Sequence, residues 1–373
     1  MRRELERIEI PGEHDARERT WAILQTAFAE RAPARRRPLH LRPAIALAVA
    51  LALLAAALSS PGMAVLDRIR KSVGIEHAAP ALFSLPSPGK LLVRTDAGVW
   101  VVQEDGSRRF VGSYREASWS PFGRFIVATR RNELTALEPD GHVHWTLARP
   151  TARLASWGGT RNDTRIAYVS GKSLRVVAGD GTGDRSSCAD VVAGVDSAWQ
   201  PGSTRHLAFA APNGAVQVYA VDTCRRLWRT RPGPAPTKLE WSGDGRRLLV
   251  VAPPGLRVYD VRGRLVARDD PSDATRDVDA TFVSGRHGVV AIRLHGHQSD
   301  VLTLFATPRS LFHVAGTLAE LVASPTGRWL LVTWPTADQW IFVRSDGRGI
   351  RAVSNISRQF DSQTFPRVEG WAP

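Results

Sequence analysis

Cysteine and lysine are both scarce in this chain. Its 373 residues include two cysteines and four lysines, so the other 46 of the 50 basic residues are arginines. Two cysteines exclude a small fold that depends on many disulfides. The arginine bias occurs beside much alanine and glycine, which is typical of a GC-rich coding background rather than of a protein that binds nucleic acid.

Several common motifs of enzymes are also absent. The sequence has no Gly-x-Ser-x-Gly elbow, no Walker-type phosphate loop, no His-Glu-x-x-His and no dinucleotide fingerprint. Residues 179–183 are rich in glycine, but they lie between two expected strands and are predicted to form a turn. We therefore expect a protein that is not an enzyme and that holds no cofactor or metal.

The composition is that of a chain that folds around a real core. It is 43% hydrophobic and 23% charged, with 31 glycines and 24 prolines. These values exclude collagen, a polytopic transporter and a largely disordered protein. The formal net charge is +14.

An uncharged run covers residues 43–66, and nothing polar interrupts Ala44 to Leu58. Fifteen helical residues cover only about 22 Å of a hydrocarbon core of roughly 30 Å, but the whole run is long enough to cross it. Arginines precede the run without acidic residues among them, which favours a cytoplasmic N-terminus. We expect a single-pass signal anchor in the cell membrane, a linker at 67–81 and an extracytoplasmic domain at 82–373. A buried soluble helix and a cleaved signal peptide are the alternatives.

The cytoplasmic segment, residues 1–42, carries a predicted helix at 15–31. Trp21, Leu24 and Phe28 lie on one stripe of that helix, and a helix of this length cannot bury them against itself. The stripe is expected to contact the membrane surface, a second copy or a cytoplasmic partner.

The rest of the chain repeats with a period near 40 residues. Residues 118–127 recur at 240–250, and looser copies place equivalent positions at Trp119, Trp157, Trp199, Trp241, Phe282 and Ala323. Each unit contains four expected strands, with Asp-Gly turns before the fourth in several of them. This pattern predicts an all-β propeller of four-stranded blades.

Closure of the ring is predicted from the end of the sequence. Residues 370–373 copy the pattern of 118–121, while Pro86 and Pro88 disfavour a first strand in the first unit. The last segment is therefore expected to complete the first blade and remove the open edges. The count favours seven blades, with six or eight possible, at residues 85–113, 117–149, 154–190, 197–231, 239–269, 280–315 and 321–353.

The Trp-Ser-Pro-Phe-Gly-Arg turn at 119–124 resembles those of bacterial TolB-type and WD-repeat-like propellers. Residues 134–141, with Trp145, are similar to the quinoprotein-type repeat. These resemblances cover residues 82–373 and imply a propeller fold, whereas the Gly-His and Trp-Asp dipeptides of eukaryotic WD repeats do not recur. The layout of the first 75 residues resembles that of single-pass anti-sigma regulators, which implies a signalling role.

Three groups of residues are candidate sites. Cys188 and Cys224 fall in neighbouring blades, and an extracytoplasmic location permits a disulfide between them. Five aspartates at 269–279 provide oxygen ligands suited to calcium, but their spacing is not that of a calcium loop, so we expect a solvated acidic loop. His142 with His144, and His295 with His297, would each need a third ligand to hold zinc or copper, and the spacing in the sequence does not reveal one.

The sequence therefore predicts a membrane-anchored extracytoplasmic propeller that binds a protein, a peptide or an envelope polymer without catalysis. About +10 of the net charge falls on the propeller, which favours anionic partners, but an outside location excludes nucleic acid. Two alternatives remain open. One is a transmembrane regulator whose cytoplasmic helix holds a sigma factor, and the other is an extracytoplasmic hydrolase or quinone-dependent oxidoreductase.

Overall fold

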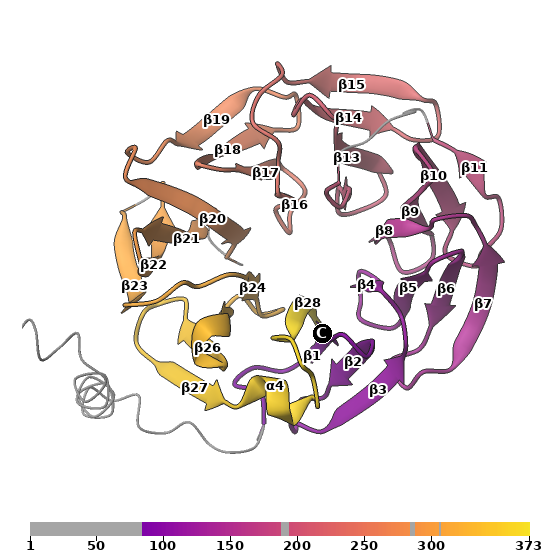
Figure 1. Cartoon of the computed structure of the whole chain (residues 1–373). Helices are drawn as coiled ribbons and strands as arrows, with labels where there is room; N and C mark the ends of the chain where they lie inside the picture. The colour runs from indigo at the N-terminus through magenta and orange to yellow at the C-terminus, as the bar shows by residue number, and fades with distance from the viewer. Residues whose placement is uncertain (1–83, 188–193, 284–287, 306) are drawn as a thin grey trace, which may run out of the picture. The chain divides into compact units, whose positions relative to one another are not determined.

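Seven four-stranded antiparallel sheets form a closed ring in the computed structural model (Figure 1). The structure describes residues 84–187, 194–283, 288–305 and 307–373. The predicted β-propeller and its count of seven blades are thus confirmed. The predicted N-terminal helix, the membrane anchor and the whole linker lie outside the described residues. Within these residues, no helix combines the length and the hydrophobicity that crossing a bilayer requires.

The four strands of each blade follow one another from the centre of the ring outward (Figure 1). Blade 1 comprises β28 (Arg367–Ala372), β1 (Lys90–Arg94), β2 (Val99–Val102) and β3 (Arg108–Gly112). Blade 2 comprises β4 (Glu116–Trp119), β5 (Ile126–Arg130), β6 (Glu133–Leu137) and β7 (Val143–Ala148). Blade 3 comprises β8 (Arg153–Gly159), β9 (Thr164–Ser170), β10 (Ser173–Ala178) and β11 (Arg185–Ser186). Blade 4 comprises β12 (Ala198–Trp199), β13 (His206–Ala210), β14 (Val216–Ala220) and β15 (Arg225–Arg229).

The remaining blades have the same order of strands. Blade 5 comprises β16 (Lys238–Trp241), β17 (Arg247–Ala252), β18 (Gly255–Asp260) and β19 (Leu265–Asp269). Blade 6 comprises β20 (Thr275–Phe282), β21 (Val289–His295), β22 (Gln298–Leu304) and β23 (Arg309–Val314). Blade 7 comprises β24 (Leu321–Ala323), β25 (Trp329–Trp334), β26 (Gln339–Arg344) and β27 (Ile350–Ser354), with the 3-10 helix η2 (Pro335–Ala337) between β25 and β26. The short helix α4 (Ile356–Gln359) follows β27.

The two ends of the propeller meet in blade 1. Strand β28 pairs antiparallel with β1, and Leu91 lies opposite Trp371 in that ladder. Arg94 of β1 also contacts Glu369 of β28, across a separation of 275 positions in the sequence. The predicted closure by the last segment is therefore confirmed.

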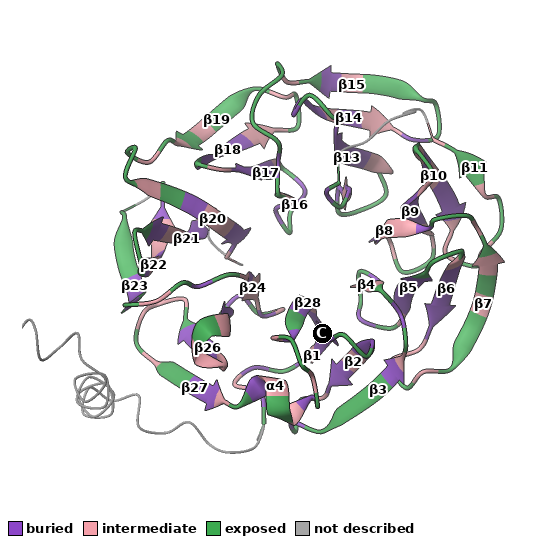
Figure 2. Cartoon of the chain, viewed as in Figure 1, coloured by how far each residue is buried: buried purple, intermediate pink, exposed green. Residues whose placement is uncertain are grey.

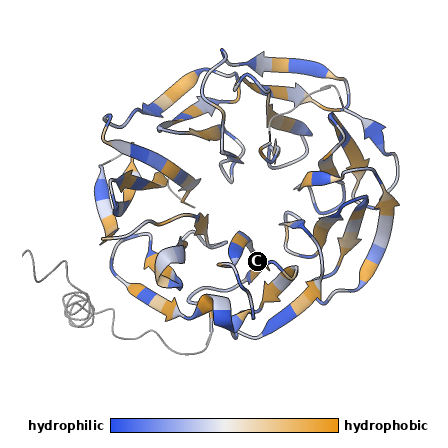
Figure 3. Cartoon of the chain, in the orientation of Figure 1, coloured by the Kyte–Doolittle hydropathy of each residue, from blue (hydrophilic) through white to orange (hydrophobic). Residues whose placement is uncertain are grey.

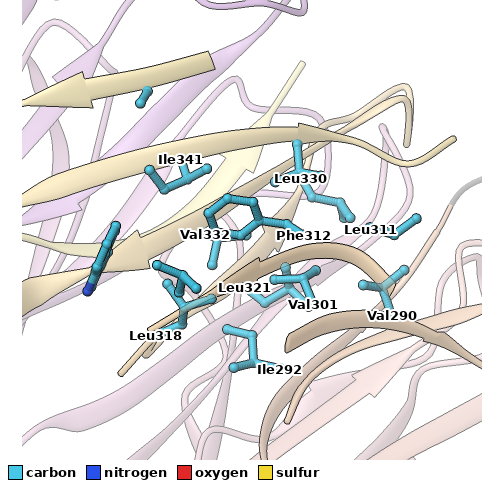
Figure 4. Packing of buried hydrophobic residues seen from close by; sticks show 14 of the residues in the cluster. Val290, Ile292, Val301, Leu311, Phe312, Leu318, Leu321, Leu330, Val332 and Ile341 are labelled. Atoms are coloured by element: carbon cyan, nitrogen blue, oxygen red, sulfur yellow. The ribbon is translucent and has the colours of Figure 1, made fainter. Parts of the chain in front are cut away.

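Hydrophobic cores lie between neighbouring blades, because each sheet packs one face against the preceding blade and the other face against the following blade. Figure 4 shows the core between blades 6 and 7, in which Ile292 and Val301 meet Leu321 and Val332. The central strands of the blades are nearly continuous runs of buried residues, as expected for sheets covered on both sides. Figure 2 shows that the outer strands are more exposed, and Figure 3 shows residues of both polarities within them.

Two tryptophans at the ends of inner strands connect one blade to the previous one. The indole Nε1 of Trp199 donates to the carbonyl of Ser156 at 3.1 Å, and that of Trp241 donates to the carbonyl of Ala198 at the same distance. Each pair joins equivalent positions of consecutive blades. The repeat in the sequence therefore corresponds to a repeated contact between blades.

Outer strands use a second contact of the same kind. Trp145 of β7 donates from Nε1 to the carbonyl of Gly179 at 2.9 Å, and its ring covers the next turn glycine, Gly181. A Cβ at Gly181 would lie 2.8 Å from that ring, and the positive φ of 85° also favours glycine. Trp228 and Gly263 repeat this arrangement between blades 4 and 5. In these two pairs of blades, a glycine of an outer turn thus receives the tryptophan ring of the preceding blade.

We expect the closing strand to contribute strongly to stability. Trp371 is 8% exposed and packs in the core between blades 7 and 1, so Trp371→Ala should lower the free energy of unfolding by about 3–5 kcal/mol. Val266 is 49% exposed on an outer strand, and Val266→Ala should change the free energy by less than about 0.5 kcal/mol. Thermal unfolding of the full chain in detergent measures both, and equal shifts in Tm would contradict the role of β28.

Candidate functional site

A pocket of about 760 Å³ lies between blades 2 and 3. Blade 2 contributes the β4–β5 turn and β7, and blade 3 contributes the end of β8, the β8–β9 turn and the β10–β11 turn. Its volume is in the range of sites for small ligands or for one or two side chains of a partner. Its lining combines aromatic rings with arginines.

Aromatic rings form much of the wall. Phe125 and Trp157 are stacked with ring centroids 5.9 Å apart, so the two blades meet through these rings. The ring of His144 stands edge-on to Phe125 at 4.8 Å, and Trp145 completes the wall. At the rim, Phe122 is 42% exposed.

Two arginines at the rim lie against aromatic rings. The guanidinium of Arg161 lies 5.3 Å from the ring centroid of Phe122, and that of Arg124 lies 5.1 Å from the centroid of Phe125. Neither arginine forms a salt bridge within the part of the chain that the structure describes. A guanidinium stacked on a ring still presents its N–H groups at its edge. Both side chains are therefore available to an anion.

The carboxylates near the pocket are engaged elsewhere. Asp163, in the same turn as Arg161, contacts Arg165 and Arg205 through its two oxygens. Glu138 contacts Nε2 of His144 at 2.9 Å. Asp180 accepts hydrogen bonds from the backbone N–H and the hydroxyl of Thr182, and these hold its pKa below its ordinary value. The positive charge of the two rim arginines is thus not neutralised by neighbouring side chains.

The polar side chains of the pocket are largely engaged within the protein. The hydroxyl of Ser120 accepts the backbone N–H of Phe125 at 2.9 Å, which is its role in the turn. No group of three or more metal-ligating side chains is found within the described ranges. Arginine and aromatic side chains are the groups that dominate the energetics of binding sites.

Acidic side chains also line up along the inner strands of the ring. Glu116 accepts the backbone N–H of Leu154 in the next blade, Asp279 accepts that of Leu321 at 2.7 Å, and Glu320 accepts that of Val368 at 2.9 Å. In each case the carboxylate of one blade caps the inner strand of the following blade. These charges therefore join blades and do not form a free anionic surface.

Lys238 is the basic member of this series. Its ammonium lies 3.1 Å from Asp279 and 3.6 Å from Glu240, and it donates to the carbonyl of Leu321 at 3.1 Å. Burial disfavours its charge, but the two carboxylates outweigh burial and raise its pKa. Blades 5, 6 and 7 are joined at the centre by this single side chain.

Asp196 occupies the equivalent position in blade 4 and differs from the others. It forms no hydrogen bond or ion pair within the described segments. Its pKa is raised to about 7, first by burial and then by the charges of Glu369 and Glu116. Glu369 and Glu116 belong to blades 1 and 2, and Asp196 itself is exposed to solvent just before β12.

The predicted site residues have different outcomes. Trp21, Leu24, Phe28 and Cys188 lie outside the described residues, so the partner-binding helix and the disulfide stay predictions. Cys224 lies in the turn before β15 with φ of 53°, as expected.

The ring centroids of His142 and His144 are 5.7 Å apart, but only His144 belongs to β7, which begins at Val143. The other pair is likewise divided between strand and turn, because β21 ends at His295.

The prediction of one solvated acidic loop at 269–279 is wrong. Strand β20 begins at Thr275, so Asp277 and Asp279 belong to the sheet and only residues 270–274 connect the strands. Asp277 is fully buried and accepts a hydrogen bond from Nε of Arg293 at 2.8 Å. Arg293 also contacts Asp269, so these carboxylates form an ion-pair network that joins blades 5 and 6.

The pocket itself was not predicted. A signal for it exists in the aligned turns, because Phe122 of blade 2 stands where blade 5 has Asp244 and blade 7 has Thr326. An exposed phenylalanine in place of a turn-forming polar residue marks a departure from the repeat.

The raised pKa of Asp196 predicts a dependence of stability on pH. The unfolded carboxyl ionises near pH 4. Between that pH and about 7 the folded state therefore binds the additional proton, and stability falls as pH rises. Asp196→Asn should flatten this part of the curve and raise Tm above pH 7 relative to the unmodified chain. Tm measured from pH 4 to pH 8 checks this, with the exposed Asp273→Asn as control. Parallel curves for Asp196→Asn and the unmodified chain would refute it.

Comparisons with known proteins show the fold alone. No protein-family model matches the chain, and no curated protein matches it. The β-propeller domain of Cps50 (Swd1) from Myceliophteria thermophila is similar, with a TM-score of 0.51 and 13% identity over 67% of this chain and 95% of that chain. The hydrazine synthase of Kuenenia stuttgartiensis has a TM-score of 0.46 and 11% identity over 62% of this chain and 76% of that chain. The chain thus has the fold of a seven-bladed β-propeller.

Proposed function

We propose that this chain is a membrane-anchored binding module of a bacterium, whose propeller lies outside the cytoplasm and binds a protein, a peptide or an envelope polymer without a catalytic step. The pocket between blades 2 and 3 carries this proposal. It presents Phe122 together with Arg124 and Arg161 to solvent, and the fold does not need these three side chains for its core.

The location outside the cytoplasm is supported by the sequence. The uncharged run at 43–66 is long enough to span a bilayer, and the arginines before it favour a cytoplasmic N-terminus. The surplus of arginine on the propeller would then face anionic polymers and acidic protein surfaces of the envelope.

A non-catalytic role is supported by the chemistry of the pocket. Its acidic neighbours are held by arginine, histidine or threonine, and its serine is held by the turn. The side chains that remain available, two guanidiniums and an exposed phenyl ring, are suited to holding a partner.

Photo-crosslinking in intact cells tests the binding role. A benzophenone amino acid at position 122 should give a covalent adduct of higher mass, because Phe122 borders the pocket. The same substitution at Val266, an exposed residue of β19, serves as the control and should give none. Equal adducts at the two positions, or no adduct at position 122, would refute binding through this pocket.

Reporter fusions test the topology independently. Alkaline phosphatase folds into an active enzyme only outside the cytoplasm, so a fusion after residue 373 should be active in a bacterial host. A fusion after residue 42 should be inactive. An inactive fusion after residue 373 that is nevertheless expressed at full length would overturn the extracytoplasmic location.

A further inference from the structure

The β4–β5 turn retains the hydrogen bonds of its counterparts but not their polar side chain. The backbone N–H of Ser120 donates to the carbonyl of Phe125, and the hydroxyl of Ser120 accepts the N–H of Phe125. Ser242 and Arg247 form the same two hydrogen bonds in blade 5. In blade 5 the turn also uses Asp244, which accepts the hydroxyl of Ser242 at 2.6 Å.

Blade 7 uses Thr326 for the same purpose, at 3.3 Å from the hydroxyl of Ser324. Phe122 makes no such bond and exposes a large apolar ring instead. The turn thus presents a ring that its own stability does not require.

Arg161 is held in place while its charge stays free. The β8–β9 turn closes with the backbone N–H of Thr160 donating to the carbonyl of Asp163 at 2.9 Å. The carboxylate of Asp163 is then fixed by Arg165 and Arg205, so it cannot neutralise Arg161. Arg161 is positioned by the ring of Phe122, which it covers. The guanidinium of Arg161 is thus fixed in position and can bind an anionic group of a ligand.

Arg124 provides a second charge at the same rim. It differs from its counterpart in blade 5, Arg246, whose Nε lies 3.9 Å from Asp244 of its own turn. In blade 2 that acidic partner is absent, because Phe122 occupies its position. One substitution in the repeat therefore both adds an aromatic ring and releases an arginine.

We infer that the pocket binds an aromatic ring that carries a carboxylate, with the ring against Phe122, Phe125 and Trp157 and the carboxylate held by Arg124 and Arg161. This inference rests on the proposed binding function and names the ligand class of the same site. The pocket volume of about 760 Å³ accommodates such a group with room for the chain attached to it.

Two kinds of ligand have this combination of groups: a free aromatic acid and a peptide that ends in an aromatic residue. Both present a ring and a carboxylate a few bonds apart. Bidentate pairing of guanidinium with carboxylate gives direction as well as affinity, and offset or edge-on contacts of rings add to it. A ligand with a neutral group in place of the carboxylate keeps only the contacts between aromatic rings.

The experiment measures binding of 3-phenylpropionate to the full chain in detergent by ligand-observed saturation-transfer NMR and calorimetry. Replacing the probe by its neutral amide should weaken binding about tenfold or more, since a hydrogen bond to a charged group contributes about 1.5–3 kcal/mol. The peptide Gly-Gly-Phe with a free carboxylate is the second probe. Tighter binding of that peptide than of phenylpropionate assigns the site to peptide termini, and the reverse order assigns it to free acids.

Matched variants localise the binding. Arg124→Gln and Arg161→Gln should each weaken binding of the acid about tenfold and leave binding of the amide unchanged. Arg246→Gln, at the same turn position in blade 5, should change neither.

Phe122→Asp copies the turn of blade 5 and should weaken binding of both probes, with circular dichroism to confirm the fold.

Two results separate this inference from the proposed function. If the amide binds as well as the acid, or if Arg246→Gln acts like Arg124→Gln, the carboxylate specificity is wrong although the pocket still binds. If no probe binds while the adduct at position 122 forms in cells, the ligand class is wrong and the binding role stands. If neither is observed, both are wrong.

Discussion

Pairing of β28 with β1 is the constraint on which the rest of the molecule depends. The propeller consists of seven separate sheets, and in this chain the last strand supplies the innermost position of the first blade. Once that blade is complete, each blade has a neighbouring blade on both of its faces. Closure also brings the backbone N–H of Val368 in β28 to the carboxylate of Glu320 in blade 7.

The repeated parts of the fold could be predicted because each blade encodes them again. The blade count was predicted from the Trp-Ser-Pro and Asp-Gly turns. Closure was predicted from the copied segment at 370–373. The acidic cluster was misinterpreted because its role depends on where β20 begins and on Arg293, which is distant in sequence. The pocket depends on how two blades approach each other, and only the anomaly at Phe122 pointed to it.

The proposed binding site coincides with a departure from the repeat. The regular devices, indoles that donate to the preceding blade and carboxylates that cap the following one, use their polar groups within the ring. At the β4–β5 turn a phenylalanine replaces the acidic residue that blade 5 uses. Arg124 of that turn and Arg161 of the β8–β9 turn have no carboxylate partner among the residues that the structure describes. Polar side chains that do not take part in contacts between blades are available to bind a ligand.

Closure by the last strand also sets an order of events during biosynthesis. Arg94 emerges 275 positions before Glu369, its partner in the finished blade. Throughout that interval the backbone groups along one side of β1 lack their final neighbour, and such an edge readily pairs with other chains. The nascent chain is therefore most exposed to such pairing at the start of the propeller.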